Sequence, residues 1–167
     1  MIYLYEYSKS ALSTKPISEL IRAYLSTKKN TNRKIELEGA IITRIEQESY
    51  RNNIGPATAV LGSEGLSDRI MLRALELISQ TAIMDVSKLL EVLDKENSLP
   101  VKKSALGVLA EKGYLHTLEE MREKPQFANG TELRMALENA IRNCIQVCTQ
   151  RGYAATLAHP RLRRVYS

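Results

Sequence analysis

Apolar side chains recur at helical spacing along most of the chain. The clearest stretch is LPVKKSALGVLAEK at residues 99–112, which has a proline at its second position and is followed by Gly113. Proline near the start and glycine just past the end are typical limits of a helix. One face of this predicted helix carries the apolar residues Val101, Ala105, Val108 and Leu109.

The same spacing, interrupted by polar or Pro/Gly-containing turns, predicts helices throughout the chain. Ser67 or Asp68 and Thr131 are the expected caps of two of them, and Glu132 suits the start of the last helix. The predicted helices cover residues 17–27, 33–50, 57–61, 68–81, 86–95, 100–112, 115–122 and 132–150.

The start of the chain has a different period. Tyrosines at alternate positions of Ile2–Tyr7 predict a short extended segment. Two interpretations are open: the tyrosines cover the end of the helical stack, or they contact a partner or stack on nucleic-acid bases.

Four of the predicted helices share a template in which an apolar residue is followed four positions later by a small or apolar one. The pairs are Ile35/Gly39, Ile70/Ala74, Val101/Ala105 and Leu133/Leu137, and their first members are 35, 31 and 32 residues apart. A shorter helix precedes each. Helix–turn–helix units at a period near thirty predict a solenoid in which Ile35, Ile70, Val101 and Leu133 occupy equivalent buried positions. The alternative is an irregular helical bundle with coincidental spacing.

Composition supports packed helices. Of 167 residues 44% are hydrophobic, yet the chain contains no Trp and one Phe, so its core must be aliphatic. No apolar run is long enough to span a membrane, and the N-terminus does not read as a signal peptide. We therefore expect a cytoplasmic protein.

The net charge of +5 is concentrated at one end. After Glu138 there are five arginines and no acidic residue, so the basic character belongs to the C-terminal part. We divide the chain into a helical-repeat domain, 1–150, and a basic C-terminal arm, 151–167. The residues through which the arm would dock on RNA, DNA or an acidic protein surface are Arg151, Tyr153, Arg161, Arg163, Arg164 and Tyr166. The alternatives are a floppy terminus or a segment folded back over the last repeat.

Catalytic and metal-binding patterns are scarce. Cys144 and Cys148 lie four apart in one helix, and two thiols need two further ligands to complete a zinc site, so we expect buried, inert cysteines. His116 and His159 have no nucleophile at a recognisable spacing, and there is no phosphate-binding glycine loop. We expect no enzyme activity, no metal and no cofactor.

The sequence VKKSALGVLAEKG resembles the second helix of a HEAT-type repeat. Val101-Lys102, Ala105 and Leu106-Gly107-Val108-Leu109 stand at the matching places, and Leu133-Arg134 keeps the start of the pattern. The resemblance implies an all-α, right-handed solenoid of about four helical hairpins.

The resemblance also implies that the second helices line a concave groove. The outward positions three, six and ten residues after each repeat start are Glu38, Ile41, Ile45, Arg73, Glu76, Gln80, Ser104, Gly107, Glu111, Ala136, Asn139 and Asn143. Three acids against one base would repel phosphate and accept a basic or apolar protein segment. The predicted partner-binding residues are Glu38, Arg73, Glu76, Glu111 and Asn139.

Basic residues recur at the turns that open these helices: Arg33, Lys34, Arg69, Lys102, Lys103 and Arg134. Stacked along one edge, they would form a basic rim for an acidic partner or nucleic acid. In the alternative interpretation they pair with acids of neighbouring turns, such as Asp68, Asp94, Glu96 and Glu132.

The sequence therefore predicts a non-enzymatic adaptor or assembly subunit that binds a protein through the groove, the arm or both. The alternative is a nucleic-acid-binding accessory protein that uses the arm and the basic rim.

Overall fold

The computed structural model describes residues 12, 14–28, 31–81 and 85–150. Within these ranges every regular element is a helix, so the predicted all-α class is confirmed. The α-helices are α2 (Ile17–Ser26), α3 (Asn32–Tyr50), α4 (Gly55–Leu61), α5 (Asp68–Ser79), α6 (Val86–Asp94), α7 (Leu99–Lys112), α8 (Leu115–Glu120) and α9 (Glu132–Gln150). Two 3-10 helices, η1 (Met121–Glu123) and η2 (Pro125–Phe127), lie between α8 and α9.

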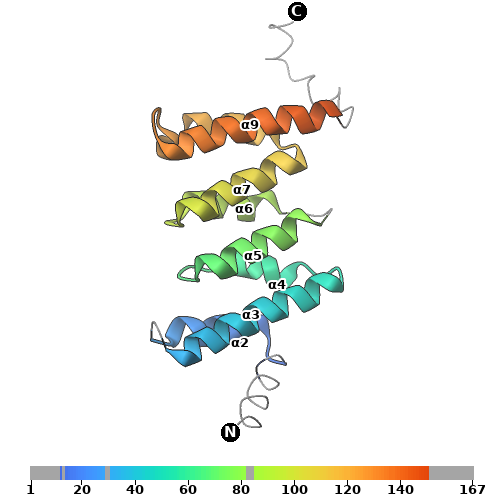
Figure 1. Ribbon diagram of the computed structural model, residues 1–167, viewed down its shortest axis with the longest axis vertical. Coiled ribbons are helices and arrows are strands. Elements are labelled where there is room, and N and C mark those ends of the chain that lie inside the picture. Colours follow the sequence, from blue (N-terminus) through green and yellow to red (C-terminus); the bar gives the residue numbers. More distant parts are fainter. Residues whose placement is uncertain (1–11, 13, 29–30, 82–84, 151–167) are drawn as a thin grey trace, which may run out of the picture. The chain divides into compact units, whose positions relative to one another are not determined.

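The chain divides into two compact units, residues 1–105 (unit 1) and 106–167 (unit 2), with the boundary inside α7. In unit 1, α2 packs against α3 and α4 packs against α5, which makes two helical hairpins. The second helices, α3 and α5, pack on each other, while α4 contacts both α2 and α6. Figure 1 shows α3 and α5 running across the near side of this unit, with α4 behind them. Unit 1 is thus built in two layers.

The core of unit 1 is aliphatic because each helix turns one apolar stripe inward. Leu37, Ile41 and Ile45 of α3 are fully buried, and so are Ile70 and Leu75 of α5. Burying each such side chain contributes about 1.5–3 kcal/mol relative to leaving it in water. The stripes follow the 3.6-residue period that the sequence pattern predicts.

The repeat register predicted for α3 is wrong. Ile35 is 66% exposed, whereas Ile41 and Ile45, predicted to face outward into the groove, are buried. The buried stripe of this helix starts at Leu37, two residues later, and continues through Ile41 and Ile45. Of the other repeat starts, Ile70 and Val101 are buried and Leu133 is half-buried. The four positions are therefore not equivalent.

Local signals set the helix ends. The Ser67 hydroxyl accepts a hydrogen bond from the Ile70 backbone N–H, and Thr131 does the same for Arg134 at α9, as expected of N-cap residues. Pro16 directly precedes α2. Gly113 ends α7 with φ of +85°, a left-handed conformation in which a side chain would be strained.

A long-range contact closes the end of α4. Gly62 is the C-cap of this seven-residue helix, and its carbonyl accepts a hydrogen bond of 2.9 Å from the Lys95 ammonium at the C-cap of α6. A cation at the C-terminus of a helix satisfies its last carbonyls and interacts favourably with the helix dipole. The contact joins the ends of α4 and α6.

Unit 2 packs α8, η1 and η2 against α9. Phe127, the sole Phe of the sequence, is fully buried there. Cys144 and Cys148 lie on the buried face of α9 as free thiols, so their predicted burial is confirmed. In the part of the chain that the structure describes, no helix has the length and apolar character needed to cross a membrane.

The register of α3 can be tested by comparing two alanine variants. Leu37→Ala should lower the free energy of unfolding by about 2–5 kcal/mol, because it leaves a cavity in the core. Ile35→Ala should change it by about 0.5 kcal/mol or less, because the side chain faces solvent. Urea denaturation followed by circular dichroism measures both. Equal losses for the two variants would contradict the observed register.

Candidate binding groove between α3 and α5

Arg73 connects the two second helices of unit 1. Its Nε donates to Glu46 Oε1 on α3 at 2.7 Å, and its NH1 donates to Glu76 Oε2, one turn further along α5, at 2.6 Å. These hydrogen bonds raise the pKa of the Arg73 guanidinium above its ordinary value, and the bond to Glu76 has a larger effect than the bond to Glu46. One guanidinium therefore serves two carboxylates, one on each helix.

A second connection joins the N-terminal half of α3 to the start of α5. Ser67 Oγ donates to Glu38 Oε2 at 2.7 Å, and Arg69 NH1 lies 3.4 Å from Glu38 Oε1. The N-cap of α5 is thus held by a carboxylate of α3. Both connections consist of polar side chains along the seam between the two helices.

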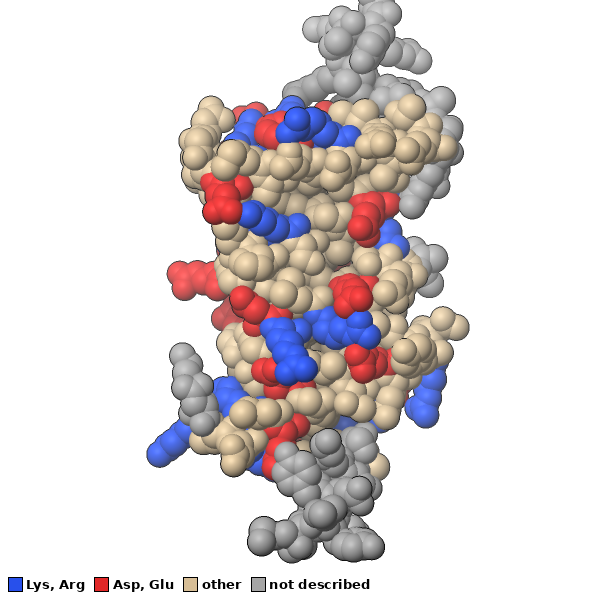
Figure 2. Space-filling model, viewed as in Figure 1, with Lys and Arg blue, Asp and Glu red and all other residues tan. Residues whose placement is uncertain are grey.

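Two depressions lie along this seam and share Glu46 and Arg73. The smaller one, of about 550 Å³, is lined by Ile42, Glu46, Arg69, Leu72, Arg73 and Glu76. The larger one, of about 700 Å³, lies toward the C-terminal ends of the helices and is lined by Glu46, Ser49, Tyr50, Asn52, Ile54, Arg73, Leu77, Gln80 and Thr81. We call the two together the α3/α5 groove. Figure 2 shows the charged side chains that gather over these helices.

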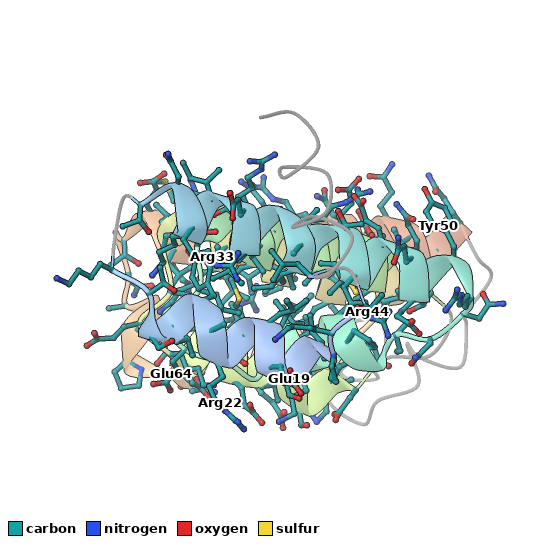
Figure 3. All side chains as sticks on the ribbon, turned by 90° about the horizontal axis from the view of Figure 1, so that it is seen from below. Glu19, Arg22, Arg33, Arg44, Tyr50 and Glu64 are labelled. Carbon is teal, nitrogen blue, oxygen red and sulfur yellow. The ribbon has the colours of Figure 1, made fainter. Side chains whose placement is uncertain are left out.

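An aromatic side chain stands at the far end of the groove. Tyr50, the last residue of α3, is 86% exposed, and Figure 3 shows it pointing away from α2. The corner behind it is fixed by the buried Glu48, which accepts a hydrogen bond of 2.8 Å from Asn53 Nδ2 and pairs with Arg44 and Arg51. The ring is therefore presented from a structured corner.

The structure brings together three of the five predicted partner-binding residues. Glu38, Arg73 and Glu76 all lie on α3 and α5 of unit 1. The other two belong to unit 2: Glu111 is exposed near the end of α7, and Asn139 is exposed on α9, where it accepts a hydrogen bond from Arg142. The groove of unit 1 is thus formed without them.

Sequence reasoning missed Glu46, Tyr50, Ile42 and Leu72. The first three lie on α3. A repeat start at Leu37 removes Ile41 and Ile45 from the outward positions, but it puts Ala40, Thr43 and Gln47 there, so the shift in register alone does not identify the groove residues of this helix. The sequence carries no signal that pairs Glu46 with Arg73, because the partial burial of Arg73 beside α3 is seen only in the structure.

Four residues of the predicted basic rim are engaged within their own units. Arg33 pairs with Glu36 at 3.2 Å, and Arg69 pairs with Glu38. Lys34 donates to the Thr27 carbonyl and lies 4.3 Å from the centre of the Tyr24 ring, a cation–π distance. The fourth, Arg134, pairs with Glu138 at 3.0 Å. Three of the four residues thus pair with carboxylates, although with Glu36, Glu38 and Glu138 rather than with the four acids given as examples. Lys102 is half-buried and Lys103 is exposed.

Arg134 belongs to a cluster in unit 2 that the sequence did not reveal. Arg122 donates to both carboxylate oxygens of Glu138, at 3.1 and 2.7 Å, in the bidentate geometry that arginine favours. Arg134 also donates to the carbonyl oxygens of Arg122 and Phe127. The cluster fastens the two 3-10 turns to α9. Its hydrogen bond from Arg122 lowers the pKa of Glu138 below its ordinary value.

The remaining predicted site residues lie outside the described part of the chain. These are Ile2–Tyr7 at the start, and the arm residues Arg151, Tyr153, Arg161, Arg163, Arg164 and Tyr166, together with His159. His116 lies on α8 and faces Glu120 at 3.1 Å. Within the described ranges, no three His, Cys, Asp or Glu side chains are grouped so that they could hold a metal ion.

Comparison with protein-family models, with curated proteins and with solved structures gave no match for this chain. Its function must therefore be argued from the geometry of the groove.

The pH dependence of stability tests the cluster in unit 2. Because the folded-state pKa of Glu138 lies below its ordinary value of 4.5, the carboxylate stabilises the fold above that pH. This contribution is lost as the pH falls through the lowered folded-state value. Native protein should therefore be more stable than the Glu138→Gln variant at neutral pH, and the difference should shrink in acid. A difference in melting temperature that is constant from pH 7 to pH 3 would contradict the assignment.

Thiol reactivity tests the burial of the cysteines. Burial raises the pKa of Cys144 to about 12, and the neighbouring Cys148 adds to the shift, so the reactive thiolate is scarce at pH 8. The folded protein should react slowly with a thiol-specific disulfide reagent at this pH, whereas both thiols should react at once in denaturant. Rapid labelling of the folded protein, followed by its absorbance, would contradict this expectation.

Proposed function

We propose that this protein is a non-enzymatic adaptor or assembly subunit that binds a segment of another protein in the α3/α5 groove. The proposal includes an architecture, a HEAT-like solenoid of about four helical hairpins that extends the two-layer arrangement of unit 1. In unit 1, α2, α4 and α6 pack in succession behind the packed pair α3 and α5, as expected of consecutive repeat units.

The observation that carries the proposal is the composition of the groove. It combines half-buried aliphatic side chains, Ile42 and Leu72, with carboxylates from both helices and an exposed aromatic ring at one end. Apolar surface with a few placed charges is the usual make-up of a peptide-binding groove. Phosphate recognition depends on a track of lysines and arginines that can reach it, whereas the two arginines that line this groove, Arg69 and Arg73, are each paired with carboxylates.

The alternative function, nucleic-acid binding through the basic rim and the arm, depends on guanidinium and ammonium groups that can reach phosphate. Arg33, Lys34, Arg69 and Arg134 already contact carboxylates, carbonyls or an aromatic ring within their units. Recruiting them would cost these contacts. The observations on the described residues therefore favour the adaptor.

The experiment is affinity capture with the full-length protein from an extract of the cells that make it, followed by affinity measurement with the purified partner. Glu76→Lys should weaken binding of that partner by about tenfold, because it reverses a charge in the groove. Glu19→Lys is the matched control, since Glu19 lies on α2 and its side chain is 52% exposed, compared with 56% for Glu76. Figure 3 shows Glu19 on the edge of α2 away from α3.

The two functions give opposite outcomes. Adaptor binding should persist after nuclease treatment and in a variant with Arg161→Glu, Arg163→Glu and Arg164→Glu. Binding that is abolished by nuclease or by this variant, and that falls steeply with salt while Glu76→Lys leaves it unchanged, would refute the adaptor and identify nucleic acid as the partner.

A further inference from the structure

The loop between η2 and α9 presents an Asn-Gly pair at the surface of unit 2. Ala128, Asn129 and Gly130 are three consecutive exposed residues, and they directly follow the fully buried Phe127. The Thr131 N–H donates to the Ala128 carbonyl at 3.3 Å, so residues 128–131 form a β-turn with Asn129 and Gly130 at its tip. The backbone of such a loop is more mobile than the helices that it connects.

The backbone nitrogen of Gly130 is the group that can attack the carboxamide of Asn129. Within the described part of the chain, the Gly130 N–H donates no hydrogen bond. Gly130 has φ of +83°, and a Cβ at this position would meet no heavy atom within 4 Å. Glycine has no side chain to hinder the attack, and its backbone changes conformation at little steric cost. The nitrogen is therefore both unbonded and unhindered.

The other asparagines for which the structure gives a position are held in different surroundings. The Asn97 carboxamide donates to the Val92 carbonyl at 2.8 Å, and the Asn53 carboxamide donates to Glu48 at the same distance. Three more lie in the helices α3 and α9, namely Asn32, Asn139 and Asn143. Asn129 is the sole asparagine of the sequence that precedes a glycine. Sequence and structure thus select the same residue.

We propose that Asn129 is a site of spontaneous deamidation through a cyclic imide formed with Gly130. The Gly130 nitrogen loses its proton to hydroxide and forms a bond to Asn129 Cγ. The bond from Cγ to Nδ2 breaks, and the departing nitrogen takes up a proton and leaves as ammonia. Water then opens the ring at either of its carbonyls, which leaves aspartate or isoaspartate at position 129. The net reaction consumes one water and releases one ammonia, with no oxidation or reduction.

The modification falls beside the start of α9. Thr131 caps this helix by accepting a hydrogen bond of 3.0 Å from the Arg134 N–H, and its hydroxyl donates to the Ala128 carbonyl at 2.9 Å. Aspartate at position 129 adds a negative charge at the end of α9 where the helix dipole favours one. Isoaspartate instead inserts a methylene into the main chain of the turn and changes the distance between Ala128 and Thr131. The two products therefore differ in their effect on the helix cap.

The test incubates the full-length protein in mildly alkaline buffer and follows each asparagine by peptide mapping with mass spectrometry. Residue 129 should change from amide to acid at a rate about tenfold or more above that of Asn97, the internal control, which is followed by serine and held by Val92. The product should contain both aspartate and isoaspartate, because the imide opens at either carbonyl. Equal rates at the two asparagines, or aspartate as the sole product, would overturn the proposal.

The variant Gly130→Ala tests the role of the attacking nitrogen. Its Cβ hinders the attack, so the rate at Asn129 should fall about tenfold, and an unchanged rate would contradict the mechanism. Alanine is strained at a φ of +83°, so circular dichroism checks that the variant is folded. The isomers formed by the native protein test the same mechanism without any substitution. The inference is independent of the proposed function, because Asn129 lies in unit 2 and the α3/α5 groove in unit 1.

Discussion

The packing of α3 on α5 is the interaction on which the rest of unit 1 depends. The buried faces of both helices are aliphatic, since Leu37, Ile41 and Ile45 share a core with Ile70 and Leu75. Aliphatic contacts of this kind are non-directional, so they bring two helices together without fixing one alignment. The polar bonds along the seam supply that alignment. Arg73 of α5 bonds to Glu46 in the second half of α3, and Glu38 of α3 bonds to Ser67 at the start of α5. The positions of both depressions follow from these two connections.

Pairing between arginine and glutamate has a different role in each of the two units. In unit 2, Glu138 accepts two hydrogen bonds from Arg122 and pairs with Arg134, and Arg134 also donates to the carbonyl oxygens of Arg122 and Phe127, so these contacts serve the fold. In unit 1, Arg73 is divided between two carboxylates, one of which is largely exposed. A carboxylate surrounded by arginines fixes turns to a helix. The guanidinium of Arg73 instead joins two helices along a partly exposed seam, and this difference is one reason why we propose the groove, and not the cluster in unit 2, as the binding surface.

Much of the fold could be predicted from the sequence because its signals are local. Ser67 and Thr131 cap helices as expected, Gly113 ends α7, and the helices follow the predicted segments within a few residues. The register of α3 could not be predicted, since Ile35 and Leu37 are both apolar and the pattern does not show which begins the buried stripe. The C-terminal end of the buried stripe could not be predicted either, because it is a glutamate, Glu48. The sequence pattern places a glutamate on the surface, and its burial is explained only by its contacts with Arg44, Arg51 and Asn53. Correcting the register would not have identified Glu46, because its place in the groove depends on how α3 packs against α5.

The bond from Lys95 to the Gly62 carbonyl has a consequence for how the fold comes apart. A helix of seven residues such as α4 is far too short to be stable alone in water, so its stability comes from contacts with the rest of the fold. Its final carbonyl is held by a residue thirty-three positions later in the chain. Loss of α6 would therefore release the end of α4, and with it the support behind α5. Opening at the end of the second hairpin is therefore coupled to opening of α6, although the two are far apart in the sequence.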